Sequence, residues 1–504
     1  MSSIARNRSV AVDAAKRIAI IIAMFAAAGA IGYGVIAIGS GRSAQTLGIG
    51  VFITVILAVA SAVLLELPVV RFVRFAFIST FFFKADINLF KVNELEDPSG
   101  LNISLSVVLA VVLIAYDHFA GREVGKGISR AFAYSAAFLL LIASASVLYA
   151  GGEALGVFSL VSLVSSFIIA LAIASHFGDR ERLIDLVVGI GVGIGFTGIT
   201  AIAQYTVEFP TSLPALGTGT EDELLGTQSQ LLSRVPAFLR TPTEMAWVVS
   251  SLLPIVLAPL LCRVKTLLSW QRILLIASIA AGSAAVILSL ARGSWVGIVV
   301  ASIIVTVTSW FVLSFNERRQ FILSVGLGSI LLVIVLLPFA GRIYERISSD
   351  DQGSALIRVP LMENAIRMIE ANPLVGVGLS GYRTYMTKYD ETGMFVSEAF
   401  PNPVHNVFAH ITSEIGIPGG LVFVLLILIC LYECFKLGFD HDILVAAIAI
   451  GLAAGFVAFI ISAMKEPGSL GSVRPPLRTL FLMFGVVFAL RALAVRSRTR
   501  GVAQ

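Results

Sequence analysis

Long apolar runs alternate with short polar connections along almost the whole chain of 504 residues. A helix needs roughly 20 apolar residues to cross the hydrocarbon core of a bilayer. The two weakest runs are 68–83, which contains Arg71 and Arg74, and 102–117. The pattern predicts an all-α polytopic membrane protein with about 14 transmembrane helices, within a range of about 12–14. The predicted spans are 18–39, 47–66, 68–83, 102–117, 131–150, 156–177, 184–204, 243–262, 273–290, 294–314, 321–340, 417–436, 443–463 and 476–495.

The composition excludes a soluble protein of this length. Hydrophobic residues make up 57% of the chain and charged residues only 13%, whereas soluble proteins are roughly 25% charged. The net charge of +5 would suggest a nucleic-acid partner in a soluble chain. Here basic residues are expected beside the cytoplasmic ends of membrane helices, so we expect membrane lipids and no nucleic acid as partners.

The distribution of basic residues predicts how the chain is oriented. The segment before the first run carries Arg6, Arg8, Lys16 and Arg17, which places the N-terminal tail, 1–17, in the cytoplasm. When the spans alternate from there, most short basic connections fall inside. The C-terminal tail, 496–504, falls inside as well. An even number of spans is therefore expected.

Three connections are too long for simple turns, and all three fall on the outer side: 84–101, 205–242 and 341–416. The last exceeds an ordinary helix connection severalfold and is expected to form a large extracytoplasmic loop with short helices. It contains a predicted helix from Val359 to Ala371, with Pro360 in the first turn and Asn372-Pro373 at the end. The expected organisation is helices over 18–340, this loop, and C-terminal helices over 417–495.

Ionisable residues on the outer side are the candidates for chemistry, because charges near membrane depth are costly unless they serve a function. Arg292 lies in a tight outer turn, and Arg240 precedes a helix start at Pro242 where Thr241 can cap. Arginine forms bidentate bonds with phosphate oxygens. His405, which follows two prolines, has an imidazole that can take a proton from a hydroxyl. Snorkelling of Arg292, a pair between Arg240 and Glu244, and a structural His405 are the alternatives.

No Walker motif, glycine-rich dinucleotide turn or Cys/His cluster occurs in the sequence. Three cysteines, Cys262, Cys430 and Cys434, have no metal-ligand spacing and are interpreted as packing residues. We expect neither a metal nor a cofactor.

Several segments together resemble the bacterial O-antigen ligase/polymerase superfamily. The resemblance covers about 240–420, roughly a third of the chain. It is carried by Arg358-Val359-Pro360 and the helix after it, Asn372-Pro373-Leu374-Val375-Gly376-Val377-Gly378, His405-Asn406-Val407-Phe408, Glu414-Ile415-Gly416-Ile417-Pro418-Gly419, Ala291-Arg292-Gly293-Ser294-Trp295, and Arg240 with Pro242.

The resemblance implies a metal-independent membrane glycosyltransferase with a GT-C-like fold in the bacterial cytoplasmic membrane. Such enzymes move a glycan from undecaprenyl diphosphate, at the outer face, to a glycan or lipid-linked acceptor. Chain-length regulators and flippases are candidate protein partners. Carried onto this chain, Arg292, Arg240 and Arg358 hold the diphosphate, and His405 orients or deprotonates the acceptor hydroxyl. Arg292 also neutralises charge during catalysis, while Asn406, Gly376, Gly378 and Tyr382 shape the cavity.

Other functions remain open at this point. A transporter or flippase for a polar or lipid-linked solute would require charged or broken helices near the midplane, whereas the glycine-rich run Val188–Gly195 is free of charge and is interpreted as close helix packing. A peptidoglycan polymerase of the shape-and-division family would need an outer-loop aspartate, for which Asp390 is a candidate. The sequence does not distinguish polymerase from ligase.

Overall fold

The computed structural model describes residues 69–83, 86–91, 100–151, 153–206, 234–348, 354–393, 396–471 and 474–502. Within these residues, ten helices are long and apolar enough to cross a membrane. They coincide with the ten predicted spans from 131–150 onward, which confirms an all-α polytopic membrane protein. The predictions for 1–17, 18–39 and 47–66 and for most of 205–242 lie outside the described residues.

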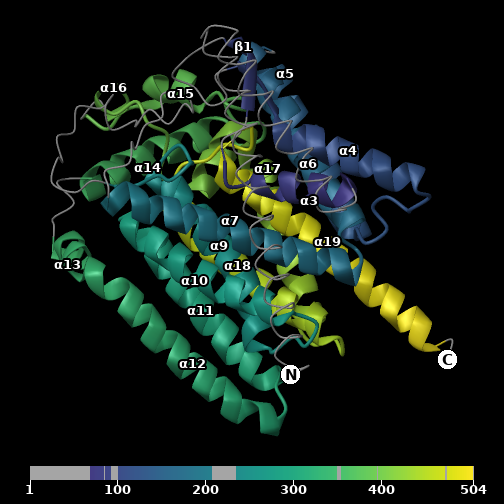
Figure 1. Ribbon diagram of the computed structural model, residues 1–504. Coiled ribbons are helices and arrows are strands. Elements are labelled where there is room, and N and C mark those ends of the chain that lie inside the picture. Colours follow the sequence, from purple (N-terminus) through teal and green to yellow (C-terminus); the bar gives the residue numbers. More distant parts are fainter. Residues whose placement is uncertain are drawn as a thin grey trace, which may run out of the picture.

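The long helices form one bundle (Figure 1). Its centre is built by α7, α9, α18 and α19, which are largely buried, whereas α12 runs along the edge with almost all of its surface exposed. The bounds are α5 Arg130–Tyr149, α6 Ala154–His176, α7 Arg180–Thr206, α9 Pro242–Leu261, α10 Ser269–Leu288, α11 Arg292–Val312, α12 Phe315–Leu336, continued by η2 Leu337–Phe339, α17 Val407–Leu437, α18 Ile443–Ala463 and α19 Pro475–Val502.

The prediction of spans at 68–83 and 102–117 is wrong. The first segment forms α3, Val69–Ser79, of 11 residues, and the second forms α4, Leu105–Phe119, of 15 residues. At a rise of 1.5 Å per residue, 15 residues cover about 22 Å, less than the roughly 30 Å hydrocarbon core. Arg71 and Arg74 hold α3 against α7, since each donates a 2.7 Å hydrogen bond to the Asp185 carboxylate.

A short β-hairpin departs from the expected purely helical fold. Strands β1, Asp86–Lys91, and β2, Gly100–Ser104, pair antiparallel with Asp86 opposite Ser104. The two strands begin within the connection 84–101, which the hydropathy pattern predicted only as a long loop, and β2 ends at Ser104. Two short strands leave the overall class all-α.

The glycine-rich run of α7 packs closely against its neighbours, as predicted. A Cβ added at Gly193 would stand 2.2 Å from the Phe82 ring, and one added at Gly191 would stand 2.3 Å from Leu275 of α10. Small residues let helix backbones approach where larger side chains cannot fit. The run therefore serves the close packing of α7 against α3 and α10.

The shorter helices of the large loop gather at one end of the bundle (Figure 1). They are α13 Ala340–Ser348, α14 Ser354–Ala371, α15 Tyr382–Tyr385, η3 Met386–Tyr389 and α16 Val396–Ala399. Because α14 starts at Ser354, Pro360 lies in its interior and not in its first turn, which corrects the predicted start at Val359. The predicted end at Ala371, before Asn372-Pro373, is confirmed.

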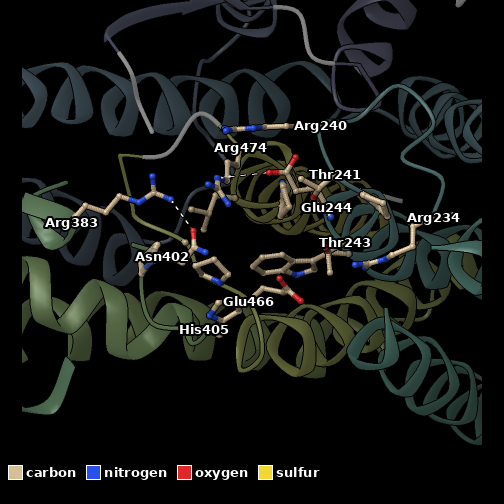
Figure 2. A pocket seen from close by; sticks show the side chains of 17 residues that line it. Arg234, Arg240, Thr241, Thr243, Glu244, Arg383, Asn402, His405, Glu466 and Arg474 are labelled. Carbon is tan, nitrogen blue, oxygen red and sulfur yellow. Dashed lines mark hydrogen bonds and ion pairs between the residues drawn. The ribbon is translucent and has the colours of Figure 1, made fainter. Parts of the chain in front are cut away.

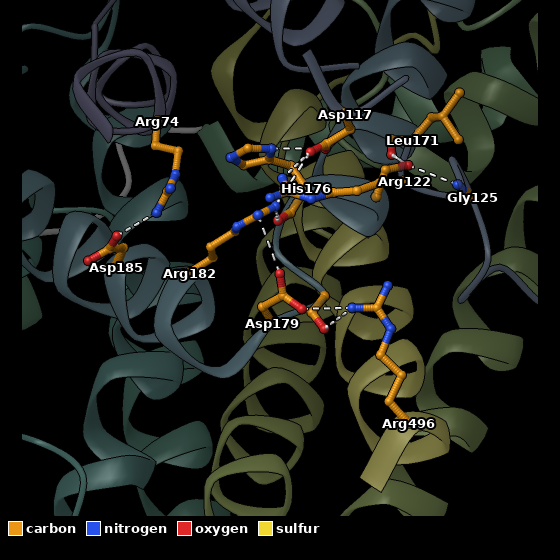
Figure 3. Close-up of polar contacts among 12 residues, drawn as sticks. Arg74, Asp117, Arg122, Gly125, Leu171, His176, Asp179, Arg182, Asp185 and Arg496 are labelled. Atoms are coloured by element: carbon orange, nitrogen blue, oxygen red, sulfur yellow. Dashed lines mark hydrogen bonds and ion pairs between the residues drawn. The ribbon is translucent and has the colours of Figure 1, made fainter. Parts of the chain in front are cut away.

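A buried polar network fastens the opposite end of the bundle (Figure 3). Asp117 of α4 accepts hydrogen bonds from Arg122 at 2.7 Å and Arg182 at 3.4 Å, and its other oxygen lies 2.9 Å from Nδ1 of His176. Asp179, which is more exposed, pairs with Arg496 at 2.7 Å. The C-terminal part of α19 is thereby joined to the ends of α4, α6 and α7.

We expect Asp117→Ala to lower the free energy of unfolding by about 3–5 kcal/mol, because it removes the buried carboxylate that Arg122, Arg182 and His176 share. Glu123→Ala is the matched control, because Glu123 and Lys126 form an exposed pair, and such a pair contributes about 0–1 kcal/mol. The measurement is the midpoint of unfolding in detergent for each variant. Equal losses in the two variants would contradict the assignment of Asp117 as the buried anchor.

Candidate functional site

A cavity of about 210 Å³ lies at the end of the bundle that carries the large loop. Its walls come from the start of α9, the segment before α17, and the connection between α18 and α19 (Figure 2). The lining residues are Arg234, Arg240, Thr241, Pro242, Thr243, Glu244, Trp247, Arg383, Asn402, Pro403, His405, Glu466, Pro467, Gly468, Arg474, Pro476 and Leu477. Four of them are arginines and two are glutamates, so the lining carries a net positive charge.

Arg240 enters the cavity from the turn that precedes α9. The turn is clamped by the Gln204 side chain, which accepts a hydrogen bond from the Ala237 amide at 2.9 Å and donates one to its carbonyl at 3.1 Å. Thr241 caps α9 by accepting from the Glu244 amide at 3.2 Å, as predicted. Arg240 therefore lies at the N-terminus of a helix, where the backbone dipole also favours an anion.

His405 lines the same cavity, immediately before α17. Asn406 caps that helix by accepting a hydrogen bond from the Ala409 amide at 3.1 Å, so the histidine is fixed one residue outside the helix. Burial lowers the pKa of His405 to about 4, and the positive charges of Arg358 and Arg474 act in the same direction. The imidazole is thus neutral at pH 7. A hydrogen bond with the Pro403 backbone acts to raise the pKa of His405 but does not offset these effects.

The connection between α18 and α19 contributes Glu466 and Arg474, which were not among the predicted site residues. Arg474 lies 3.8 Å from the Glu244 carboxylate. Burial raises the pKa of Glu466 to about 7, against the charges of Arg234, Arg358 and Arg474, which lower it. Figure 2 shows His405 and Glu466 along one wall, across from Arg240 and Arg474. The cavity thus has a cationic side and an acid–base side.

Two further arginines reach the cavity from opposite directions (Figure 2). Arg383, next to Tyr382 in α15, donates to the Asn402 side chain at 3.4 Å. Arg234 donates to the Ser289 carbonyl at 2.9 Å, at the turn before α11. Trp247 adds an indole Nε1 that is buried and has no hydrogen-bond partner among the residues with described positions. Guanidinium and indole N–H groups are suitable donors to the oxygens of an anionic, hydroxyl-rich ligand.

The structure places Arg292 beside the cavity, outside its lining. Its guanidinium donates to the Arg346 carbonyl of α13 at 2.6 Å, and Arg346 donates in turn to the Leu290 carbonyl at 3.2 Å. The neighbouring Gly293 packs against Lys465, which precedes Glu466. Arg358 is exposed and does not line the cavity either, but its charge acts on both His405 and Glu466. Of the predicted residues, Arg240 and His405 are brought together directly.

Gly376, Gly378 and Tyr382 lie outside the cavity lining and pack against α17. The Gly378 amide donates to the Glu414 carbonyl at 3.0 Å, beside the break in α17 at Ile415 and Gly416. Gly376, with φ of +69°, approaches the same carbonyl so closely that a Cβ would stand 2.3 Å from it. This contact joins the Asn372–Gly378 turn to the helix that carries His405.

The glycine at 376 gives a testable consequence of this contact. We expect Gly376→Ala to lower the free energy of unfolding by about 1–3 kcal/mol, because the backbone conformation is strained and the new methyl group meets Glu414. Gly393→Ala is the matched control, since Gly393 has φ of +67° and open space around it. The measurement compares thermal unfolding midpoints. An equal shift in both variants would mean that conformation alone matters at Gly376.

The Asp390 carboxylate accepts hydrogen bonds from residues of its own loop. Burial acts to raise its pKa, but hydrogen bonds from Ser397 and Thr392 prevail and lower it to about 2. Both its oxygens accept from these residues, at 2.5–3.1 Å. Such a carboxylate is a poor base at neutral pH. In the part of the chain that the structure describes, no three His, Cys, Asp or Glu side chains are grouped so that they could hold a metal ion.

Residues 276–424 match the sequence model of a family described as O-Antigen ligase. This match supports the assignment of the chain to the O-antigen ligase/polymerase family, in agreement with the resemblance in the sequence. The matched region includes Arg292, Arg358, Arg383 and His405, whereas Arg240, Glu466 and Arg474 lie outside it. A search of curated proteins finds no match.

Proposed function

We propose, from this assignment to the O-antigen ligase/polymerase family and from the cationic cavity, that the protein is a membrane glycosyltransferase. It takes a glycan from undecaprenyl diphosphate at the outer face of the bacterial cytoplasmic membrane and transfers it to a hydroxyl of an acceptor glycan. A membrane glycan-processing role of this type follows from the family. The donor, the face of the membrane and the residue roles are our proposal.

The observation that carries this proposal is the pairing of four cavity arginines with a neutral histidine in one space. The diphosphate bears the negative charge that grows when the sugar–phosphate bond breaks. Arg240, Arg383 and Arg474 are positioned to stabilise that charge, as preorganised donors do in other enzymes. The helix N-terminus beneath Arg240 adds a favourable dipole.

His405 holds the acceptor in this proposal. A neutral imidazole has one nitrogen that accepts a hydrogen bond, and His405 lines the cavity as a neutral imidazole. An acceptor hydroxyl can donate to it and be held with its oxygen toward the anomeric carbon. Arg292 is proposed to act at the edge of the cavity, where it ties α13 to the turn before α11.

The orientation proposal follows from the helix connections. Because successive spans alternate, the residues of the cavity all fall at helix ends opposite the Asp117 network. The Asp117 end carries Arg122, Arg182 and Arg496, as expected of the cytoplasmic side. The cavity is then extracytoplasmic, where lipid-linked glycans and their acceptors meet.

Deletion of the gene followed by analysis of the surface polysaccharide tests this function in the cell. Loss of chain length with one repeat unit still attached indicates a polymerase. Accumulation of long lipid-linked polymer, none of it attached, indicates a ligase. An unchanged surface polysaccharide would contradict both forms of the proposal.

A further inference from the structure

We propose that Glu466 is the second acid–base residue of the transfer reaction, and that it takes the proton which the acceptor hydroxyl, held by His405, must lose. This inference rests on the proposed glycosyltransferase function and extends it. Glu466 lies outside the region matched by the family model, on the connection between α18 and α19, and lines the cavity together with His405.

The position of Glu466 is fixed by a buried polar cluster immediately behind it. The Gly468 amide donates to Nδ1 of His410 at 3.2 Å, and the Ser469 hydroxyl donates to the Glu414 carboxylate. Both partners belong to α17, the helix whose N-terminus presents His405. Pro467 further restricts the segment between Glu466 and these anchors. His405 and Glu466 are therefore held on one rigid frame, as acid–base groups must be.

The same frame reaches the large loop. The Tyr382 ring packs edge-on against His410, with ring centroids 4.9 Å apart, and the Glu414 carbonyl accepts from Ser146 at 2.8 Å as well as from Gly378. The contacts of the large loop, of α5 and of the connection that carries Glu466 thus converge on His410 and Glu414 of α17. This arrangement fixes the backbone of the short connection beside Glu466.

The charges that act on Glu466 come from several elements, and not all of them line the cavity. Arg234 and Glu244 face it from the chain before and within α9, Arg474 from its own connection, and Arg358 from α14. His405 shares the cavity. Burial keeps the pKa of Glu466 near 7 despite three nearby cations, so the carboxylate is a stronger proton acceptor than His405, whose pKa is about 4.

The proposed step is balanced without a further reactant. The acceptor oxygen forms a bond to the anomeric carbon of the donor sugar, while the bond from that carbon to the diphosphate oxygen breaks. The electron pair of the broken bond leaves with undecaprenyl diphosphate, beside the arginines. The hydroxyl proton passes to the Glu466 carboxylate and is released to water or to the departing diphosphate.

The test uses purified full-length protein in nanodiscs, with undecaprenyl diphosphate carrying one repeat unit of the organism's surface glycan as donor and a defined acceptor glycan. We expect Glu466→Gln to lower kcat about 10²–10⁴-fold with little change in the affinity for inorganic pyrophosphate. Wild-type kcat/KM should fall as the pH drops below about 7, because Glu466 becomes protonated; in Glu466→Gln this acidic limb should be absent. Glu466→Asp, which keeps a carboxylate, should retain more activity and the limb.

Glu398→Gln is the matched control, since Glu398 is exposed in α16 and does not line the cavity. A Glu466→Gln protein that is folded, binds pyrophosphate and transfers glycan at the wild-type rate would overturn the role of Glu466 and leave the proposed function intact. If Glu466→Gln does not fold, Glu466→Asp serves as the test. Wild-type kcat and pH dependence in Glu466→Asp would support the need for a carboxylate. Loss of the acidic limb from its pH profile would overturn the role of Glu466. Absence of transfer by the wild-type protein would overturn the proposed function and this inference with it.

Discussion

Replacing His405 with alanine should reduce glycan transfer by at least about 100-fold while leaving donor binding nearly unchanged. The imidazole lines the cavity and is neutral because burial, Arg358 and Arg474 lower its pKa to about 4. Its removal takes away the hydrogen-bond acceptor that orients the hydroxyl, but leaves the arginines for the diphosphate. The measurement is kcat from labelled donor, together with the pyrophosphate affinity of the same preparation.

Two variants make this result specific. His441→Ala is the matched control, because His441 is exposed at the other end of the bundle. His405→Gln keeps an oxygen that can accept a hydrogen bond, so we expect it to retain more activity than His405→Ala. Wild-type turnover in a folded His405→Ala protein would show that the acceptor is held elsewhere.

Replacing Arg240 with alanine should weaken binding of the diphosphate about 10- to 100-fold. A hydrogen bond to a charged group contributes about 1.5–3 kcal/mol, and Arg240 lies in the cavity over the N-terminus of α9. Binding of inorganic pyrophosphate to the purified protein, measured by calorimetry, gives the affinity directly. The transfer reaction should show a raised KM for the lipid-linked donor.

Arg319→Ala is the control for loss of a positive charge as such. Arg319 is exposed on α12 and does not line the cavity. We expect its pyrophosphate affinity to match that of the wild-type protein. A similar loss of affinity in both variants would indicate a general effect of net charge and would contradict a specific contact at Arg240.

Hydropathy alone was sufficient for ten of the helices, because spanning length is a property of each segment by itself. The segment 68–83 was predicted to cross from its apolar content. Hydropathy could not show that Arg71 and Arg74 pair with Asp185 in α7. The interpretation of the α7 glycines as packing residues is confirmed, since their close neighbours leave no room for a side chain.

The candidate site was only partly predictable. Arg240 and His405 follow from the search for ionisable residues on the outer side, and both line the cavity. The same criterion applies to Glu466 and Arg474, in the short connection before the last span, but that connection resembles an ordinary turn in length. What the sequence could not reveal is that His410 and Glu414 fasten this connection beside His405. Such proximity depends on tertiary packing between segments some 60 residues apart.

The central claim is that this cavity transfers a glycan from a lipid diphosphate to an acceptor hydroxyl. Its most direct test is a single-turnover reaction of the purified protein in nanodiscs with doubly labelled donor and a defined acceptor. The account predicts that glycosylated acceptor and free undecaprenyl diphosphate appear together in equal amounts, and that neither appears with His405→Ala. Donor that is bound by the wild-type protein but stays intact in the presence of acceptor would contradict the account.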